Sequence, residues 1–232
     1  MQKWIFDIRS RPFVLTVLAF LLVTFLVYFQ VTKQFDESVI VYFHSISGNA
    51  VLDLLMQSIT EAGDVIYMFL FASALLIIKR TRRIGLSLMI LVVLATLLTG
   101  YIKCGVDRDR PNLDFEGTLF PVIIIEGTPF HIGISKDTAA LFCEGSFNAS
   151  FPSGHAARAT IFGIILGYAL SQRFPRGCYL LLLYPLLMSI SRMYVIQHYP
   201  MDVIGGTILG IMLAGVVAKK TKLLKKFESS KT

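Results

Sequence analysis

Three short segments of the chain carry side chains that could do chemistry together. They span residues 103–111, 151–155 and 191–202, and they hold cationic, imidazole and carboxylate groups. Ammonium and guanidinium groups bind phosphate oxygens, and the planar fork of a guanidinium matches two such oxygens at once. This mixture of residue types predicts a site for a phosphate-bearing anion.

Five residues of these segments are candidates for binding the anion. Lys103, Arg110 and Arg192 supply three positive charges. Ser153 and Gly154 follow a proline at the start of an expected helix, where free backbone N–H groups and the helix dipole attract anions. Such a preorganised cradle would stabilise the charge that develops during phosphoryl transfer. Taken singly, Lys103 and Arg110 could instead anchor a helix end at a membrane interface, and Ser153 could serve only as an N-cap.

Three further residues are candidates for the chemical step. His198 and Asp202 lie four positions apart at an expected helix start, close enough for the carboxylate to accept one imidazole N–H. That contact would fix the tautomer and leave the other ring nitrogen free to act as a nucleophile. His155 is a second imidazole that could protonate the leaving oxygen. We therefore expect phosphoryl transfer through a phosphohistidine.

The order and spacing of these residues resemble the signature of a known family. The segments read Lys-x6-Arg-Pro, Pro-Ser-Gly-His and Ser-Arg-x5-His-x3-Asp, in that order. Over residues 103–202, this pattern is similar to that of the type 2 phosphatidic acid phosphatase superfamily, which also includes vanadium haloperoxidases and bacterial acid phosphatases. The resemblance implies that His198 attacks phosphorus, that Asp202 orients it, and that His155 protonates the leaving group.

The resemblance also implies which residues hold the phosphoryl oxygens, namely Lys103, Arg110, Ser153, Gly154 and Arg192. It implies no metal and no other cofactor, and the sequence agrees because no cluster of acids and histidines has metal-ligand spacing. One charged residue lies outside the pattern. Arg158, one turn after His155, could contact the substrate headgroup, or it could pair with Glu61 or Asp64.

The composition indicates where such a site operates. Of the 232 residues, 55% are hydrophobic and only 16% are charged, against about 25% charged in an ordinary soluble domain. This balance excludes a soluble globular enzyme, a disordered chain and a small disulfide-rich scaffold. A membrane-spanning helix needs about 20 mostly apolar residues. We interpret six stretches as spans, of which the second is short: 12–31, 64–78, 84–102, 153–170, 178–196 and 201–218. We expect an all-α bundle of six transmembrane helices that forms a single domain over residues 1–232.

Two other stretches complete the expected architecture. Residues 35–59 alternate apolar and polar types, which favours an amphipathic segment lying at the membrane interface. Residues 103–151 form a long outer loop, and its apolar run at 120–125 could dock on the membrane surface.

The basic residues predict the orientation of the bundle. Most of the 22 Lys and Arg residues lie at the N-terminus, in two short loops and in a basic tail at 219–232. Because cytoplasmic segments carry such an excess, both termini are expected in the cytoplasm. The site then faces the periplasmic or extracellular side of the plasma or inner membrane. The net charge of +7 would contact anionic lipid headgroups, so no nucleic acid partner is expected.

The cysteines carry a further expectation about the outer side. Cys104 and Cys143 both fall on that side, which is oxidising in many cells, so they would form a disulfide or remain two free thiols. The three cysteines show no metal-binding spacing.

A membrane position favours a lipid phosphate or diphosphate as the substrate. Compact members of the family that this sequence resembles commonly act on polyprenyl diphosphates. The resemblance therefore favours a polyprenyl diphosphate, such as undecaprenyl or dolichyl diphosphate, cleaved to the monophosphate. Phosphatidic acid, phosphatidylglycerol phosphate and lipid A phosphates follow, and nothing in the motifs separates these substrates. A lipid phosphotransferase is a second enzyme alternative. A lipid transporter that keeps the cationic cradle only for binding is the non-enzymatic alternative.

Overall fold

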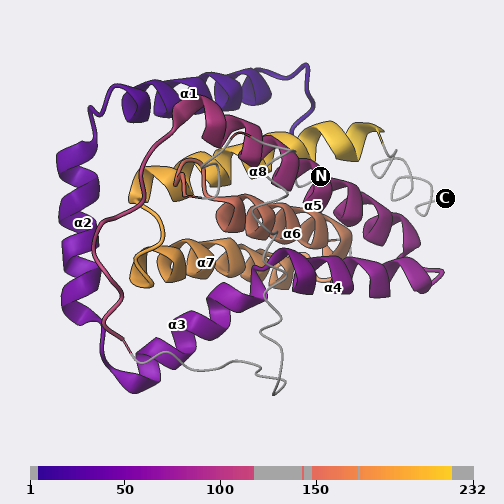
Figure 1. Cartoon of the computed structure of the whole chain (residues 1–232). Helices are drawn as coiled ribbons and strands as arrows, with labels where there is room; N and C mark the ends of the chain where they lie inside the picture. Colours follow the sequence, from indigo (N-terminus) through magenta and orange to yellow (C-terminus); the bar gives the residue numbers. More distant parts are fainter. Residues whose placement is uncertain (1–4, 118–142, 144–147, 172, 221–232) are drawn as a thin grey trace.

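Helices form all the regular secondary structure in the part of the chain that the computed structural model describes, which is residues 5–117, 143, 148–171 and 173–220. Within these residues the order is α1 (Arg11–Tyr28), α2 (Lys33–Ile46), α3 (Ala50–Ala62), α4 (Val65–Ile77), α5 (Arg82–Val106), α6 (Gly154–Leu170), a 3-10 helix (Gly177–Leu182), α7 (Leu183–Tyr194) and α8 (Pro200–Lys220). The expected all-α fold is therefore confirmed (Figure 1). The predicted apolar run at 120–125 and residues 221–232 of the predicted tail lie outside the described residues.

Four helical segments have the length and apolarity of membrane spans. They are α1, α5, the 3-10 helix continued by α7 (Gly177–Tyr194), and Pro200–Ala218 of α8. Helices α3 and α4, bent by 55° where they meet, would add a fifth span that is broken in its middle. Helix α6 has 17 residues and is shorter than these segments. The expectation of six spans therefore stays a prediction.

The stretch expected to be amphipathic forms α2 and α3, and α3 turns its polar side inward. Helix α3 buries Asp53 and exposes Val51, whereas α2 buries Ile40 as well as Asp36 and exposes both apolar and polar side chains. A helix of a soluble protein shows the opposite arrangement to α3, with its apolar stripe facing the core. The apolar outer face of α3 suits contact with lipid.

Helix α6 lies at the centre of the bundle, in contact with α5, α7 and α8 (Figure 1). Most of its side chains are buried, and many are as small as those of Ala156 and Ala159. Small residues let helices approach closely. The approach to α8 leaves no room for a side chain, because a Cβ on Gly206 would lie 2.2 Å from the Ser153 carbonyl oxygen. The start of α6 is therefore held against the first two turns of α8.

A disulfide joins Cys104, in the last turn of α5, to Cys143 in the long segment between α5 and α6. Of the two states expected for this pair, the structure contains the bridge. It attaches the long segment to the helix end that carries Lys103. The third cysteine, Cys178, is buried and has a free thiol.

Candidate active site

The three polar segments meet at one end of the bundle. Helices α5 and α7 end there, and α6 and α8 begin there. The predicted site residues come from these helix ends and from the loops beside them: Lys103, Arg110, Ser153, Gly154, His155, Arg192, His198 and Asp202.

Backbone hydrogen bonds join the segments directly. The N–H of Ser153 donates to the carbonyl of Asp202 at 2.9 Å, which links the second segment to the third. The N–H of Ser150 donates to the carbonyl of Arg108 at 2.7 Å, which links the approach to the second segment with the first. Segments far apart in the sequence are thus held within one site.

Neutral oxygens orient two of the three predicted cations. The ammonium group of Lys103 donates to the carbonyl of Ala149, and the guanidinium of Arg110 donates to the side-chain oxygen of Gln197. Arg192 is almost fully buried, and its Nε has no hydrogen-bond partner among the described residues. A buried donor without a partner is costly unless a ligand occupies the site. Arg192 therefore has a donor available for an anion.

The imidazole of His198 lies among these cations and is only 2% exposed. Burial lowers the pKa of His198 well below its ordinary value of 6.5, and the charges of Arg192, Lys103 and Arg110 lower it further. A buried base surrounded by positive charge disfavours its own protonation. The ring is therefore neutral near pH 7 and keeps a lone pair.

Asp202 lies beside His198, although the expected hydrogen bond is not formed. The Nδ1 atom of His198 is 3.7 Å from Oδ2 of Asp202, which is beyond hydrogen-bond distance, and Nδ1 has no partner among the described residues. Oδ2 instead accepts the N–H of Tyr199 at 2.8 Å. The two predicted partners therefore lie close together without the hydrogen bond that the sequence led us to expect.

Ser153 is the N-cap of α6, which is the purely structural role considered for it from the sequence. Its Oγ accepts the N–H of Ala156 at 3.4 Å, and its side chain is fully buried. Gly154 is the first residue of the helix, followed by His155, which is partly exposed. The capping contact uses a lone pair of the hydroxyl, so the hydroxyl proton can still be donated to an anion. Capping and anion binding are therefore compatible roles.

Arg158 contacts neither of the acids with which it could have paired. Its Nε and Nη2 donate to the carbonyl of Gly63 at 3.3 and 3.1 Å, and the structure gives it no ion pair with a described carboxylate. Its Nη1 lies against Gly154, since a Cβ on that glycine would be 3.1 Å away. Arg158 thus contacts the first residue of α6 on one side and the bend between α3 and α4 on the other.

Two charged residues at the site were not among the predicted ones. Arg108 donates from Nη1 to Asp202 at 2.8 Å and from Nη2 to Asp36 at 2.7 Å. Arg108 lies inside the first polar segment, so its charge and position could have identified it as a site residue from the sequence. Asp36 has no sequence signal, because it lies on α2, far along the chain from every motif.

Carboxylates and histidines at this end of the bundle do not gather as metal ligands. Within the described ranges, no three His, Cys, Asp or Glu side chains form a group that could hold a metal ion. The positive charge around His198 comes from Lys103, Arg110 and Arg192. The expectation of metal-free chemistry stays a prediction.

Comparison with known proteins places this arrangement in a family. Residues 84–225 match the model of the PAP2 superfamily. The chain is 30% identical to an undecaprenyl-diphosphatase of Sulfolobus acidocaldarius over 182 residues, which cover 77% of this chain and 76% of the relative. It is 33% identical to phosphatidylglycerophosphatase B of Bacillus subtilis over 101 residues, 40% of this chain and 49% of that protein.

A solved structure has the same fold. The crystal structure of a transmembrane PAP2-type phosphatidylglycerolphosphate phosphatase from Bacillus subtilis superimposes with a TM-score of 0.68 at 22% identity, over 94% of this chain and 100% of the other. The family match covers more than half of the chain and contains all eight predicted site residues. The chain therefore belongs to the PAP2 superfamily, as an integral membrane protein.

Proposed function

We propose that this protein is a lipid phosphatase that hydrolyses its substrate through a phosphohistidine on His198. One observation carries the proposal: the buried imidazole of His198 lies among three cations and beside a buried carboxylate. Cations bind the phosphoryl group, a neutral imidazole can attack it, and a carboxylate stabilises the imidazolium that results.

The proposed reaction has two steps. In the first, a ring nitrogen of His198 attacks phosphorus, so a P–N bond forms while the P–O bond to the leaving group breaks. His155 donates a proton to the departing oxygen. In the second step, water attacks phosphorus, gives its proton to His155, and breaks the P–N bond to release phosphate. Lys103, Arg110 and Arg192, with the N–H groups at the start of α6, hold the remaining oxygens through both steps.

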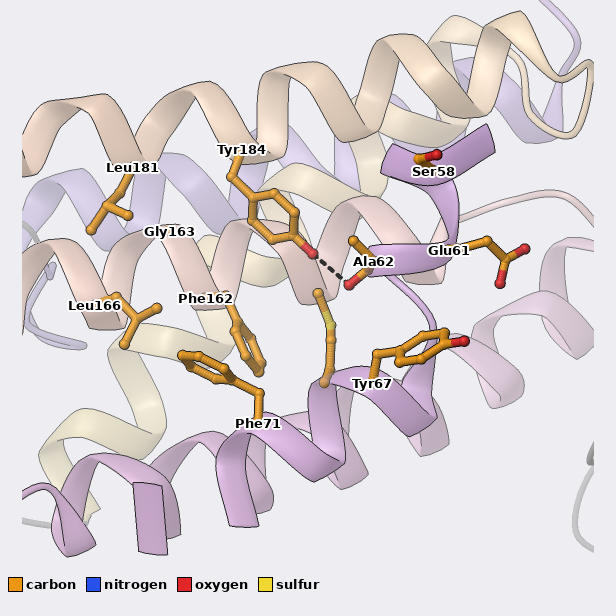
Figure 2. A pocket seen from close by; sticks show the side chains of 11 residues that line it. Ser58, Glu61, Ala62, Tyr67, Phe71, Phe162, Gly163, Leu166, Leu181 and Tyr184 are labelled. Carbon is orange, nitrogen blue, oxygen red and sulfur yellow. Dashed lines mark hydrogen bonds between the residues drawn. The ribbon is translucent and has the colours of Figure 1, made fainter. Parts of the chain in front are cut away.

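A cavity further along α6 supports an apolar chain as the rest of the substrate, although no predicted site residue lines it. It has a volume of about 670 Å³, and Figure 2 shows side chains of Phe71, Phe162, Leu166 and Leu181 around it. Phe162 and Leu166 follow His155 by seven and eleven positions, a spacing that places all three on one face of α6. A lipid whose phosphate lies at the site would therefore find apolar surface about 10 Å further along the same face of α6.

Among lipids we propose a polyprenyl diphosphate, converted to the monophosphate, as the substrate. The undecaprenyl-diphosphatase relative supports this choice, because it aligns with 77% of the chain. Phosphatidylglycerol phosphate is the second candidate, supported by the phosphatidylglycerophosphatase B relative and by the structural neighbour. In chemical terms, a diphosphate offers a phosphate-stabilised leaving group, whereas a phosphate monoester must expel an alkoxide.

A substrate panel tests the proposal. Purified protein is assayed for phosphate release from undecaprenyl diphosphate, phosphatidylglycerol phosphate and phosphatidic acid, and we expect the highest kcat/KM for the diphosphate. EDTA should leave the rate unchanged. His198→Ala should lower kcat by about 10³-fold or more, while His44→Ala, a histidine of α2 outside the site, should not.

Other outcomes of the panel would select other functions. Labelled phosphate that appears on an acceptor lipid, with none released, would identify a phosphotransferase. Lipid movement that survives His198→Ala, with no phosphate release by the wild type, would identify a transporter. Release from none of the lipids would refute the proposal.

The disulfide supports a site that faces the outside of the cell. Cys104 is the neighbour of Lys103, and disulfides persist in oxidising compartments. The basic residues in the loops and the tail of the sequence support the same orientation, so we propose that both termini are cytoplasmic. We also propose that residues 1–232 act as one membrane domain.

A further inference from the structure

Arg108 bridges two buried carboxylates at the site. Its Nη1 donates to Oδ1 of Asp202 at 2.8 Å, and its Nη2 donates to Oδ2 of Asp36 at 2.7 Å. Both aspartates are fully buried. These are charge-assisted hydrogen bonds from a rigid, planar donor, so they fix the direction of both carboxylates.

Asp36 also holds the start of the helix that carries Asp202. Its Oδ1 accepts the N–H of Met201 at 3.1 Å, in the first turn of α8, and its Oδ2 accepts the hydroxyl of Thr32 at 2.9 Å. The first N–H groups of a helix lack partners within the helix, and a carboxylate there satisfies them. Asp36 thus fixes Arg108 and the first turn of α8 at the same time.

The bridge determines which oxygen of Asp202 faces the nucleophile. Because Oδ1 is engaged by Arg108, Oδ2 is the atom that approaches Nδ1 of His198, at 3.7 Å. The ring of Tyr199 lies 4.2 Å from the guanidinium carbon and supports the plane of Arg108.

The charge of Arg108 is used within this cluster. Burial by itself would lower the pKa of Arg108, but Asp202 and Asp36 outweigh it and raise the pKa above its ordinary value. Two carboxylates balance the positive charge of this guanidinium, so it attracts an anionic substrate less than an unpaired guanidinium would. This distinguishes Arg108 from Arg192, whose Nε has no described partner.

We propose that Asp36 and Arg108 are positioning residues, which act through Asp202 to align His198 for attack. The inference rests on the proposed phosphatase function and adds α2 to the machinery of the site. Asp36 lies outside the family match at 84–225, so α2 supplies a support that the motifs do not contain.

A double-mutant cycle with Asp36→Asn and Arg108→Gln tests the inference. Each single variant should lower kcat by about 10- to 100-fold, the loss expected when a catalytic group is displaced by about 1 Å. KM should stay within about twofold, because neither residue binds the substrate. The double variant should be at least as active as Arg108→Gln alone. The amide oxygen of the asparagine can still accept the N–H of Met201, and in the absence of Arg108 the change removes an uncompensated buried charge.

The control is Asp53→Asn, which alters an equally buried aspartate that binds the hydroxyl of Tyr194 instead of Arg108. Thermal unfolding of every variant is measured alongside activity. We expect Asp53→Asn to lower Tm but to keep kcat within about twofold of the wild type, because its carboxylate accepts from Tyr194 and Gly48 and not from Arg108.

Four outcomes would overturn the inference. An Arg108→Gln variant with raised KM and unchanged kcat would make Arg108 a substrate ligand. Additive losses in the double variant would show that Asp36 and Arg108 act separately. Equal losses of kcat in Asp36→Asn and Asp53→Asn would indicate a merely structural role, and a fully active Asp36→Asn enzyme would remove the role altogether. In all four the wild type releases phosphate, whereas an inactive wild type would instead refute the proposed function.

Discussion

The positive charges around His198 have two effects at the scale of single residues. On the proposed mechanism they bind the phosphoryl group. They also add to burial, the largest cause, in lowering the pKa of the His198 imidazole. Without them, a buried histidine beside Asp202 would be more readily protonated, because an opposite charge favours the cationic ring. The same side chains therefore attract the substrate and preserve the nucleophile.

The pH dependence of the reaction should report this effect. Protonation removes the lone pair of His198, so kcat/KM should fall as pH decreases through its pKa, which lies below 6.5. Arg192→Gln should raise that pKa and move the acid limb to higher pH. Arg110→Gln should move the limb less, because Arg110 lowers the pKa less than Arg192 does. The measurement is a pH profile of kcat/KM for the three proteins on one substrate.

Comparison on one substrate is the control, because the ionisation of the lipid phosphate is then common to all three proteins. An acid limb at the same pH in all of them would contradict the assignment of His198 as the titrating group.

Sequence alone was sufficient to select eight of the residues that gather at this end of the bundle, but not Arg108 or Asp36. Their positions follow from helix starts and ends, which local signals such as Ser153 before Gly154 mark well. The contact between Asp36 and Arg108 could not be predicted in this way. It depends on how α2 crosses the start of α8, and that is a tertiary arrangement without a local pattern.

At the scale of elements, the course of α6 supports six crossings. Helix α6 begins at the site, and α7 ends there. The chain between them must leave the site and return, as the neighbouring spans do. A helix of 17 residues rises about 25 Å, which brings it close to the thickness of a bilayer core. We therefore propose that α6 crosses the membrane together with the longer spans.

The contact between α6 and α8 can be tested at Gly206. A Cβ there would meet the Ser153 carbonyl at 2.2 Å and displace the start of α6. We expect Gly206→Ala to lower kcat by about tenfold or more, because it moves the anion-binding turn, and to lower Tm. Gly105→Ala is the matched control on α5, since nothing lies within 4 Å of its added Cβ. Equal activity of the two variants would show that this contact does not position the site.

Periodicity predicted the long helices well but not which face of α3 is buried. The expected spans at 84–102 and 201–218 correspond to α5 (Arg82–Val106) and α8 (Pro200–Lys220). For α3, an amphipathic pattern does not state which side faces inward. Its polar side is buried because its partners are polar: Tyr194 donates to Asp53, and Thr60 donates to Ser191. Such pairing is invisible in one segment considered by itself.

At the scale of the whole molecule, the proposed orientation predicts which surfaces an impermeant reagent can reach. In a Cys178→Ser background, a thiol introduced by Glu116→Cys should react with an impermeant maleimide on intact cells. A thiol introduced by Lys79→Cys, in the loop between α4 and α5, should react only after the membrane is permeabilised. Both positions are exposed in the structure. The reverse pattern of labelling would place the site on the cytoplasmic side.

The position of Asp36 bears on how much of the chain is needed for activity. A fragment that began at residue 84 would retain every motif side chain. It would nevertheless leave the Met201 amide uncapped and Arg108 with a single counter-ion. The smallest autonomous enzyme would therefore extend well upstream of the conspicuous signature, and truncation studies or chimaeras built on that signature alone would discard part of the apparatus.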